Sequence, residues 1–388
     1  MKTKNLTQIS NVTTGKLDAN AEIPDGKFPF FTCAPTPMRI NTFSFDDDVV
    51  LLAGNNAQGN FHLQRYKGKF DAYQRTYVIT AKKGYDIDYI KYSLELSLKH
   101  LKRLAQGSQT KFLTMQILDS FQVLDVPYEE QKTLISSVYA IDSKIRLNDR
   151  ICSELEAMAK VLYDYWFVQF DFPDENGKPY RTSGGEMVWN EQLKREIPKG
   201  WKVGNLYSVA DFINGLACQK FRPKDGEKAF PVIKIKEMHD GITAETEQVS
   251  ENIPSKHKIF DGDILFSWSA TLEVMYWYGG SGGLNQHIFK VNPKSYFPKE
   301  YVYEQLSSYI INFVKMAEAR KTTMGHITTD HLEQSKIPLP PESLLKQFAE
   351  KIRPIHLKIG QTKQENRELT KLRDWLLPML MNGQARVE

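Results

Sequence analysis

Residues Gln131–Trp166 read QKTLISSVYAIDSKIRLNDRICSELEAMAKVLYDYW. Small or apolar residues recur in this stretch at alternating spacings of four and three, a heptad pattern typical of a helix that packs along another helix. The seam positions are Leu134, Val138, Ile141, Ile145, Asn148, Cys152, Leu155, Ala159, Leu162 and Trp166. The stretch contains no proline or glycine, so an unbroken helix roughly 55 Å long is predicted. Such a helix is too long for one compact domain and is predicted to be a spacer.

The composition fits a soluble protein of two domains. The 388 residues are enough for two domains with connectors, and the net charge of +4 is mild. A nucleic-acid partner would therefore require locally placed basic groups or a partner subunit that shares the charge. Three cysteines without a C-x-x-C pattern suit a reducing compartment. Without an apolar leader or an apolar run that could span a bilayer, we expect a cytoplasmic protein with no membrane contact.

The segments around the long helix occur twice in the chain. The matched segments are Leu6, Ile9, Val12 and Gly15 with Leu206, Val209, Phe212 and Gly215; Phe28–Phe31 with Phe230–Ile233; Phe45–Leu51 with Phe260–Phe266, at an offset of 215; Tyr73–Tyr77 with Asn285–Phe289; and Thr114 and Leu118 with Thr328 and Leu332, at an offset of 214. The offset of 214 continues through the long helix, so a second one is expected over Phe348–Leu380. Any two amphipathic helices could align in this way, but the globular segments match in the same order. The pattern indicates a tandem duplication.

Each globular part is predicted to be a mixed α/β domain. The expected strands are Phe28–Thr32, Val49–Ala53, Thr76–Thr80, Val232–Ile235, Ile259–Trp268 and His287–Val291, and the expected helices are Ile87–Arg103 and Lys299–Ala319. Residues 171–200 are rich in proline, glycine, asparagine and charge, and are predicted to form an extended linker. The clusters Ala53–Gly59 and Gly279–Gly283 are expected to be loops.

Two like domains that each carry a long helix are most simply related by a pseudo-twofold axis, with the helices paired as an antiparallel coiled coil. Asn148, Thr362 and Asn366 would then fix the register of the pair. Pro354 is expected to mark the first turn of the second helix or a kink, and Leu372 is expected to replace the seam residue Arg373. A ligand with its own dyad and a repeat of about 34 Å fits this arrangement, namely duplex DNA contacted at two half-sites.

Several motifs resemble the DNA-specificity (S) subunit of type I restriction-modification systems. They are Trp166–Pro173, Asn176–Tyr180, Ser183–Gly185, Val188–Trp189, Ile197–Trp201, and the segments ahead of the two helices, Val126–Gln131 and Ile337–Glu342. The resemblance covers the whole chain. It implies target-recognition domain 1 at residues 1–128, spacer helix 1 at 129–170, a linker at 171–200, target-recognition domain 2 at 201–340 and spacer helix 2 at 341–388.

The resemblance also implies a function. Each target-recognition domain would bind one half of a split double-stranded DNA sequence, and the helices would set the gap and dock two modification (methyltransferase) subunits. Restriction (motor-nuclease) subunits would join this core. S-adenosylmethionine, ATP and magnesium would then belong to the partner subunits, with no cofactor in this chain. The docking surface is expected on the outer face of the first helix, at Lys144, Arg146, Asp149, Arg150, Glu154 and Tyr163.

The sequence offers no credible active site. The one Pro-Pro pair, Pro340-Pro341, lacks the Asn or Asp before it and the aromatic residue after it that an amine methyltransferase needs, and there is no P-loop. The histidines are scattered without metal-ligand spacing. Asp46-Asp47-Asp48 could bind a metal but is more simply a turn with solvated charges, and Cys152 is expected to pack in the helix seam.

Polar, glycine-containing loops after strands are the expected DNA contacts, because Asn and Gln match adenine while Arg and Lys match guanine. The candidates in the first domain are Asn55, Asn56, Gln58, Asn60, Gln74, Arg75, Gln109, Thr110 and Lys111. Those in the second are Lys220, Arg222, Ser267, Trp268, Ser269, Thr271, Gln286, His287, Lys321, Thr322, Thr323 and His326. Individually, each could equally be an ordinary loop residue. Possible phosphate contacts are Lys16, Arg39, Lys67, Lys69, Lys220, Arg222 and Lys224, which position a protein on DNA without reading sequence.

Two other hypotheses remain open at this point. The chain could be a scaffold whose twin domains bind protein partners without contacting DNA, or a self-contained methyltransferase. The absent catalytic motifs count against the methyltransferase. The loops that carry Asn, Gln and Arg at matching places in both repeats favour a non-catalytic DNA-binding subunit over the scaffold.

Overall fold

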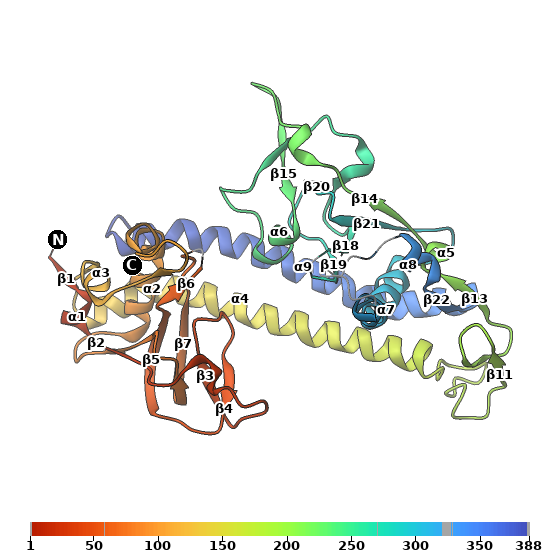
Figure 1. Ribbon diagram of the computed structural model, residues 1–388, viewed down its shortest axis with the longest axis horizontal. Helices are drawn as coiled ribbons and strands as arrows, with labels where there is room; N and C mark the ends of the chain where they lie inside the picture. Colours follow the sequence, from red (N-terminus) through yellow and green to blue (C-terminus); the bar gives the residue numbers. More distant parts are fainter. Residues whose placement is uncertain (1, 58, 270, 320–326, 328, 386–388) are drawn as a thin grey trace. The chain divides into compact units, whose positions relative to one another are not determined.

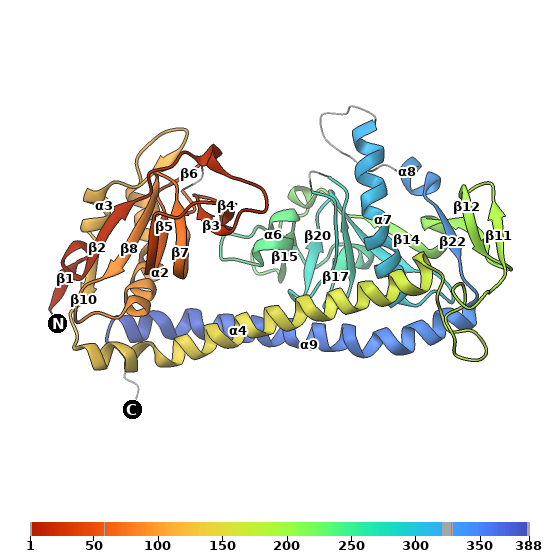
Figure 2. The ribbon, with the colours of Figure 1, turned by 90° about the horizontal axis from the view of Figure 1, so that it is seen from below.

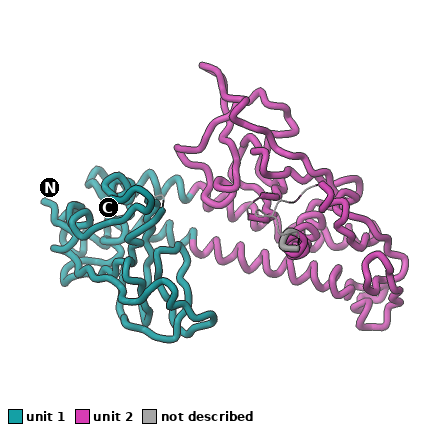
Figure 3. The backbone as a smooth tube through the Cα atoms, in the orientation of Figure 1, with its two compact units in different colours: residues 1–145, 369–388 teal, residues 146–368 magenta. Residues whose placement is uncertain are grey.

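The computed structural model describes residues 2–57, 59–269, 271–319, 327 and 329–385. The chain divides into two compact units, shown in Figure 3: unit 1 comprises Met1–Ile145 and Leu369–Glu388, and unit 2 comprises Arg146–Glu368. Both long helices contribute residues to both units. Each unit is therefore built from segments that lie far apart in the sequence.

Most elements of unit 1 return in the same order in unit 2, although each unit also has elements of its own. The elements up to the first long helix are β1 (Thr3–Asn5), α1 (Leu6–Ile9), β2 (Ser10–Thr14), β3 (Phe28–Phe31), β4 (Met38–Ile40), β5 (Phe45–Ala53), β6 (Asn55–Asn56), β7 (Leu63–Ala72), β8 (Thr76–Ala81), α2 (Ile87–Leu104), β9 (Lys111–Phe112), α3 (Met115–Asp119), β10 (Gln122–Leu124) and α4 (Tyr128–Tyr163). The later ones are β11 (Met187–Asn190), β12 (Arg195–Pro198), β13 (Lys202–Asn205), α5 (Leu206–Val209), β14 (Ala210–Asn214), β15 (Ala229–Ile233), α6 (Ile235–Asp240), β16 (Gln248–Ser250), β17 (Lys258–Ile259), β18 (Ile264–Ser267), β19 (Glu273–Tyr276), β20 (Gly282–Leu284), β21 (Ile288–Pro293), α7 (Lys299–Ala319), α8 (Thr329–Gln334), β22 (Lys336–Leu339) and α9 (Glu342–Met381).

Unit 1 is built on a six-stranded sheet in the order β2-β8-β5-β7-β3-β4 (Figures 1 and 2). Because side chains alternate along a strand, β5 supplies two cores. Val50 and Leu52 pack with the residues of α2, whereas Val49 and Leu51 pack with aromatic side chains on the other face of the sheet. Asp86 caps the N-terminus of α2, because its carboxylate accepts hydrogen bonds from the N–H groups of Asp88 and Tyr89 in the first turn.

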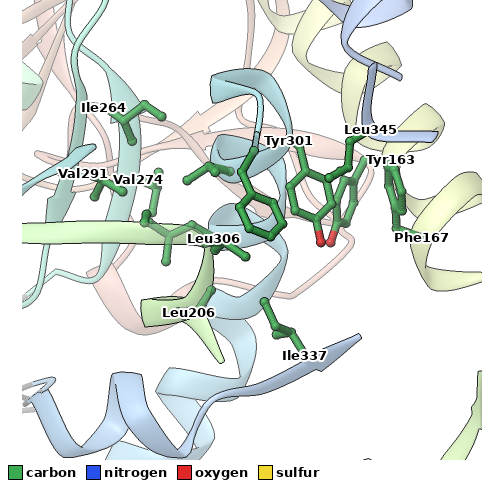
Figure 4. Packing of buried hydrophobic residues seen from close by; sticks show 14 of the residues in the cluster. Tyr163, Phe167, Leu206, Ile264, Val274, Val291, Tyr301, Leu306, Ile337 and Leu345 are labelled. Carbon is green, nitrogen blue, oxygen red and sulfur yellow. The ribbon is translucent and has the colours of Figure 1, made fainter. Parts of the chain in front are cut away.

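Unit 2 repeats the central part of this sheet in the order β14-β21-β18-β19, and a second sheet has the order β16-β15-β20-β17. Helix α7 packs on β19 and β21. Its buried face meets the end of α4 and the start of α9, so the core of unit 2 includes both long helices. Figure 4 shows Tyr163 and Phe167 beside Tyr301 and Leu345 in this core.

The duplication predicted from the sequence is visible in the buried positions. Every fully or nearly buried residue of α2 returns as a buried residue of α7 at an offset of 212, since 301 − 89 = 212. The pairs are Tyr89 and Tyr301, Ile90 and Val302, Tyr92 and Glu304, Ser93 and Gln305, Leu94 and Leu306, and Leu101 and Phe313. The two units therefore share one arrangement of backbone and buried positions, the common frame.

One part of the sequence alignment is wrong by a residue. An offset of 215 matched Val49 with Ile264. In the sheets, however, Val50 lies opposite Ile79 and Ile264 lies opposite Val291, which is the equivalent of Ile79. The offset is therefore 264 − 50 = 214. A shift of one residue exchanges the two faces of a strand, so an alignment based only on apolar residues could not detect it when both faces are buried.

The long helices pair antiparallel within each unit. In unit 1, Val138 of α4 shares a core with Leu377 and Leu380 of α9. In unit 2, Asn148 donates from Nδ2 to Asn366 Oδ1 and to a Glu365 carboxylate oxygen, both at 2.8 Å. The asparagine that interrupts the heptad pattern thus pairs with polar residues of the other helix.

Four details of the helices differ from the expectations. The α-helical part of α4 ends at Tyr163, three residues before Trp166, and Asp164–Val168 form a π-helical turn. Helix α9 begins at Glu342, so Pro354 lies inside it. Leu372 is 45% exposed and does not replace the seam residue. Arg373 itself donates from Nη1 to the buried Asp142 at 3.3 Å, which keeps a charged residue in the seam.

The segment 171–200 is not extended. It contains the antiparallel pair β11 and β12, and its apolar residues pack on the core of unit 2. Phe172 stacks on Tyr180 with ring centroids 4.7 Å apart and on Trp201 at 5.5 Å. The aromatic residues among the prolines and glycines were the signal that this segment folds.

Two further assignments change in unit 1. Asp46–Asp48 do not form a turn but belong to strand β5, where Asp48 pairs with Arg65 and Lys67 of the neighbouring strand β7. Strand β7, the longest in the unit, was not predicted, because most of its first seven residues are polar or charged and partly exposed. Its partner carboxylates on β5 explain why those charges are tolerated in a sheet.

Substituting Phe348 should destabilise unit 2 strongly. Its ring is fully buried and lies 4.8 Å from Phe167 and 5.7 Å from Trp166, between centroids. Phe348→Ala would leave a cavity there, and we expect a loss of about 3–5 kcal/mol in the free energy of unfolding, measured by chemical denaturation. Leu357→Ala on the same helix, where the side chain is 59% exposed, is the matched control and should change stability by less than about 0.5 kcal/mol.

Asp142 should give unit 1 a pH-dependent stability. Burial opposes ionisation of its carboxyl, but Lys91, Tyr92 and Arg373 outweigh burial and hold its pKa below the ordinary value of 3.8. A lowered pKa stabilises the fold above the unfolded-state pKa, and this contribution is lost as the pH falls through the folded-state value. Asp142→Asn should therefore cost about 2 kcal/mol at pH 7, with a smaller difference from wild type below about pH 4.

The control for that measurement is Asp47→Asn, because Asp47 is exposed on β5 of the same unit. It should leave the denaturation midpoint of unit 1 unchanged across this pH range. A deficit of Asp142→Asn that stays constant down to pH 2 would contradict the ionic role of Asp142.

Candidate nucleic-acid interface

Three loops that carry the predicted DNA contacts meet at one end of the sheet in unit 1. Gly54 follows β5, and its N–H donates to the carbonyl of Arg75 in the β7–β8 turn at 2.9 Å. The carbonyl of Gly54 accepts from the N–H of Leu113 at 2.8 Å, which ties in the segment after α2. Strands β6 and β9 add a ladder between Asn56 and Lys111. The backbone therefore brings three separate candidate loops together.

Unit 2 makes the same two connections at equivalent positions. The N–H of Trp268 donates to the carbonyl of His287 at 3.4 Å, and the carbonyl of Trp268 accepts from the N–H of Ile327 at 3.0 Å. These positions correspond to Gly54, Arg75 and Leu113, since 54 + 214 = 268, 75 + 212 = 287 and 113 + 214 = 327. The site is thus a feature of the duplicated frame.

A glycine in each unit brings a fourth loop against this site. A β-carbon on Gly15 would lie 1.9 Å from the carbonyl oxygen of Ala72, and one on Gly215 would lie 2.0 Å from that of Asn285. No other residue fits such a close backbone approach. The chain after Gly15 then continues alongside the β7–β8 turn, where Gln74 N–H donates to the Leu17 carbonyl at 2.9 Å.

Polar side chains of unit 1 are available at this end of the sheet. Gln74, Arg75, Gln109 and Thr110 are exposed, whereas Asn55, Asn56 and Lys111 are half-buried. Asn60 is exposed, and its side-chain oxygen accepts from Lys102 Nζ at 2.7 Å. Lys102 lies on α2 and was not among the predicted contacts. The loops 54–60, 73–76 and 105–114 contain no Asp or Glu, so the site is positively charged.

The side chains in unit 2 are more apolar. The ring of Trp268 lies 5.6 Å from that of His287, and its Nε1 donates to the side-chain oxygen of Asn214 at 3.2 Å. Gln286 Nε2 lies 3.3 Å from His287 Nε2. Asn214 was not among the predicted contacts, because it ends a strand far from the other loops in sequence.

The other candidates of unit 2 are placed differently. Thr271, Lys220 and Arg222 are exposed. Ser267 and Ser269 are buried, and the Ser267 hydroxyl donates to the Ser269 carbonyl at 3.3 Å, so they shape the loop and do not reach the surface. Five candidates lie outside the described residues: Gln58, Lys321, Thr322, Thr323 and His326.

Three of the basic residues considered for phosphate contact are engaged elsewhere. Lys67 and Lys69 lie opposite Asp48 and Asp46 in the β5–β7 register, at the end of β7 away from loop 54–60. Arg39 donates from Nε to the Gly26 carbonyl at 2.9 Å. The remaining residues of this set are exposed: Lys16, Lys220, Arg222 and Lys224.

The described residues provide no group of three His, Cys, Asp or Glu side chains that could hold a metal ion. Burial raises the pKa of the Cys152 thiol and raises that of Cys218 to about 11, so both are protonated and unreactive at neutral pH. Within the described part of the chain, no helix is long and apolar enough to cross a membrane.

Comparisons with known proteins agree with this organisation. The family model described as "Type I restriction modification DNA specificity domain" matches residues 1–157 and 198–371. The Escherichia coli type I restriction enzyme EcoDI specificity subunit is 26% identical over 358 residues, which cover 88% of this chain and 78% of that protein. The MjaIX specificity subunit of Methanocaldococcus jannaschii is 23% identical over 325 residues, which cover 80% of this chain and 72% of that protein.

A solved structure shares the fold. The crystal structure of the type I restriction-modification system S subunit from M. genitalium aligns with a TM-score of 0.57 at 14% identity, and the alignment covers 98% of this chain and 96% of that one. The family model matches twice, once for each repeat, and accounts for most of the sequence. The protein therefore belongs to the type I restriction-modification DNA-specificity family.

Proposed function

We propose that this chain is the non-catalytic specificity subunit of a type I restriction-modification complex and that each unit binds one half of a split DNA sequence. The observation that carries this proposal is the loop cluster that recurs in both units. The same pair of backbone hydrogen bonds, at Gly54 and at Trp268, gathers amide, guanidinium and imidazole side chains in loops without acidic residues. Such groups match the edges of DNA bases in the major groove.

The chemistry of the two clusters suggests different half-sites. Arg75 and Lys111 in unit 1 suit guanine, and Gln74 and Asn56 suit adenine. In unit 2, Trp268 offers an apolar ring of the kind that contacts a thymine methyl group. Lys16, Lys102, Lys220 and Arg222 would contact phosphates, which position the protein without specifying a sequence.

We further propose that α4 and α9 fix the distance between the half-sites and dock two methyltransferase subunits. The exposed face of α4 carries Leu147, Met158 and Val161, which are 54%, 58% and 67% exposed. Charged residues Lys144, Arg146, Asp149, Arg150 and Glu154 are exposed beside them. Tyr163, however, is 3% exposed and cannot belong to this surface. Exposed apolar residues within a charged surface are typical of a protein interface.

In this proposal S-adenosylmethionine, ATP and magnesium bind to the modification and restriction subunits. Residues Asn176–Tyr180 and Ser183–Gly185, which carry part of the family resemblance, belong to the folded segment that follows α4. The cytoplasmic location expected from the sequence remains a prediction.

Arg75 gives a direct test of base recognition. Arg75→Ala should weaken binding to the methylated target by about 1–3 kcal/mol and relax specificity at one base pair of the first half-site. Genome-wide mapping of N6-methyladenine in cells that carry the variant would identify that position. Lys69→Ala, at the far end of β7, is the control and should leave the methylated sequence unchanged.

The scaffold hypothesis predicts another result. If the twin units only bound proteins, Arg75→Ala would leave both the methylated sequence and DNA affinity at wild-type levels. The salt dependence of DNA binding provides a second measurement, because Lys102→Ala should reduce its slope by about one if Lys102 contacts a phosphate.

The helices should act as a ruler. A four-residue insertion after Ile145 in α4, matched by one before Leu369 in α9, adds roughly 6 Å to both helices. We expect the unspecified gap in the methylated sequence to lengthen by about two base pairs, while the bases of both half-sites stay the same. A changed half-site with an unchanged gap would contradict the ruler function.

A further inference from the structure

Unit 2 contains a cavity of about 290 Å³ among α4, α7, α9 and β19. Its walls combine aromatic rings with a buried histidine–glutamate pair. Among the lining residues are Ala157, Tyr276, Tyr303, Glu304, Ser307 and His356. None of these belongs to the loop cluster proposed to contact DNA, so the cavity requires a separate explanation.

The equivalent place in unit 1 is filled by an arginine. Arg373 of α9 reaches Asp142 of α4, with Nη1 3.3 Å from the carboxylate oxygen. Asp142 also accepts from Tyr92 at 2.8 Å and from Lys91 at 3.1 Å, and Lys91 pairs with Glu95 at 2.8 Å. The guanidinium group of Arg373 thus completes a charged network between the domain helix and the long helices.

In unit 2 the frame is the same, but two residues of this network are replaced by residues with shorter side chains. The offset of 214 relates Asp142 to His356 and Ala159 to Arg373, and the offset of 212 relates Glu95 to Ser307. Alanine thus replaces arginine, and serine replaces glutamate. Ser307 lines the cavity, and Ala159 lies in α4 between the lining residues Ala157 and Lys160. The cavity thus lies where unit 2 lacks the long side chains that Arg373 and Glu95 supply in unit 1.

The cavity keeps the groups that a guanidinium requires. His356 Nε2 lies 3.0 Å from Glu304 Oε1, and both residues are at least nine-tenths buried. Among the described residues nothing pairs with His356 Nδ1. If neutral His356 donates from Nε2 to Glu304, Nδ1 is an acceptor that lacks a donor. A donor carried by the ligand would satisfy it.

The aromatic walls add to this preference. Tyr276 and Tyr303 stack with centroids 4.3 Å apart, and both line the cavity. A planar cation is attracted to the face of such rings. The lysines at the cavity already have partners, because Lys160 pairs with Asp164 and Lys363 with Glu156. The carboxylate of Glu304 and the tyrosine rings are therefore the groups that a ligand would meet.

We propose that this cavity is a binding site for the guanidinium group of an arginine side chain on a protein partner. In unit 1 the same position holds a guanidinium group that the chain supplies itself. A protein source fits the surroundings, because Ala157 at the rim is exposed and α4 beside it exposes Met158 and Val161. The inference does not depend on DNA recognition, so either proposal can fail without the other.

Binding can be measured on the full chain with three matched small molecules. N-acetyl-arginine methylamide carries the guanidinium, the citrulline analogue has the same shape without charge, and the lysine analogue has charge without the planar fork. In titration calorimetry, the arginine analogue should bind at least about tenfold more tightly than either of the others. Equal binding of all three, or no binding of the arginine analogue, would overturn the proposal.

Variants locate the binding in the cavity. Glu304→Gln keeps the size of the side chain and should weaken binding of the arginine analogue about tenfold. Glu300→Gln is the matched control one turn earlier on α7, where Glu300 pairs with Arg353 at 3.0 Å, and it should bind as wild type does. If the control loses affinity as strongly as Glu304→Gln does, binding lies elsewhere and the site is wrong.

Two arginine variants complete the test. Ala157→Arg introduces a guanidinium at an exposed position of the rim, where the fold is not at risk, and should prevent binding of the arginine analogue. Arg373→Ala vacates the equivalent place in unit 1 and should add a second site for the same analogue. Unchanged binding in Ala157→Arg would contradict the cavity as the site.

Discussion

The antiparallel pairing of α4 with α9 is the constraint on which the rest of the structure depends. The apolar core of unit 1 includes Val138 and Leu380, and that of unit 2 includes Tyr163 and Phe348, so each core takes one end of each helix. Neither unit can complete its core until both helices are present. Register is therefore decisive, and the polar contacts of Asn148 with Glu365 and Asn366 supply it, because an apolar seam alone tolerates slippage. This couples the folding of segments that are more than 200 residues apart.

Duplication let the two copies of this frame diverge in their polar contacts. Tyr92 and Asp142 in unit 1 correspond to Glu304 and His356 in unit 2, so a hydrogen bond between the domain helix and the long helix is kept while both partners change. Keeping the bond is favoured because a buried polar group without a partner is costly. The charge of the side chains around this hydrogen bond is not kept between the two units. Arg373 corresponds to Ala159 in unit 2, so the ion network of unit 1 is not repeated beside the cavity.

The sequence predicted elements with a regular apolar period and missed those whose stability comes from partners. Helix α7 was placed with its observed bounds, because every buried position follows the helical spacing. Strand β7 was missed because Arg65 and Lys67 look like loop residues until Asp48 on the neighbouring strand is known. The folded segment 171–200 was missed for a related reason, since its stability comes from Trp201 and from the core of unit 2. Such contacts join residues that no local pattern connects.

The candidate interface, too, could be predicted from the sequence only in part. The repeats pointed to loops at matching places in both halves of the chain, and the structure brings the loops at Gly54, Arg75 and Lys111 together. The sequence did not indicate which of their side chains reach the surface. Ser267 and Ser269 turn inward, whereas Lys102 and Asn214 join the site from elements that carry no such signal. The loops are held by backbone hydrogen bonds, which do not depend on side-chain identity. Side chains at the site can therefore change without disturbing the frame, and a specificity subunit needs this property if its DNA sequence is to diverge while its partners stay the same.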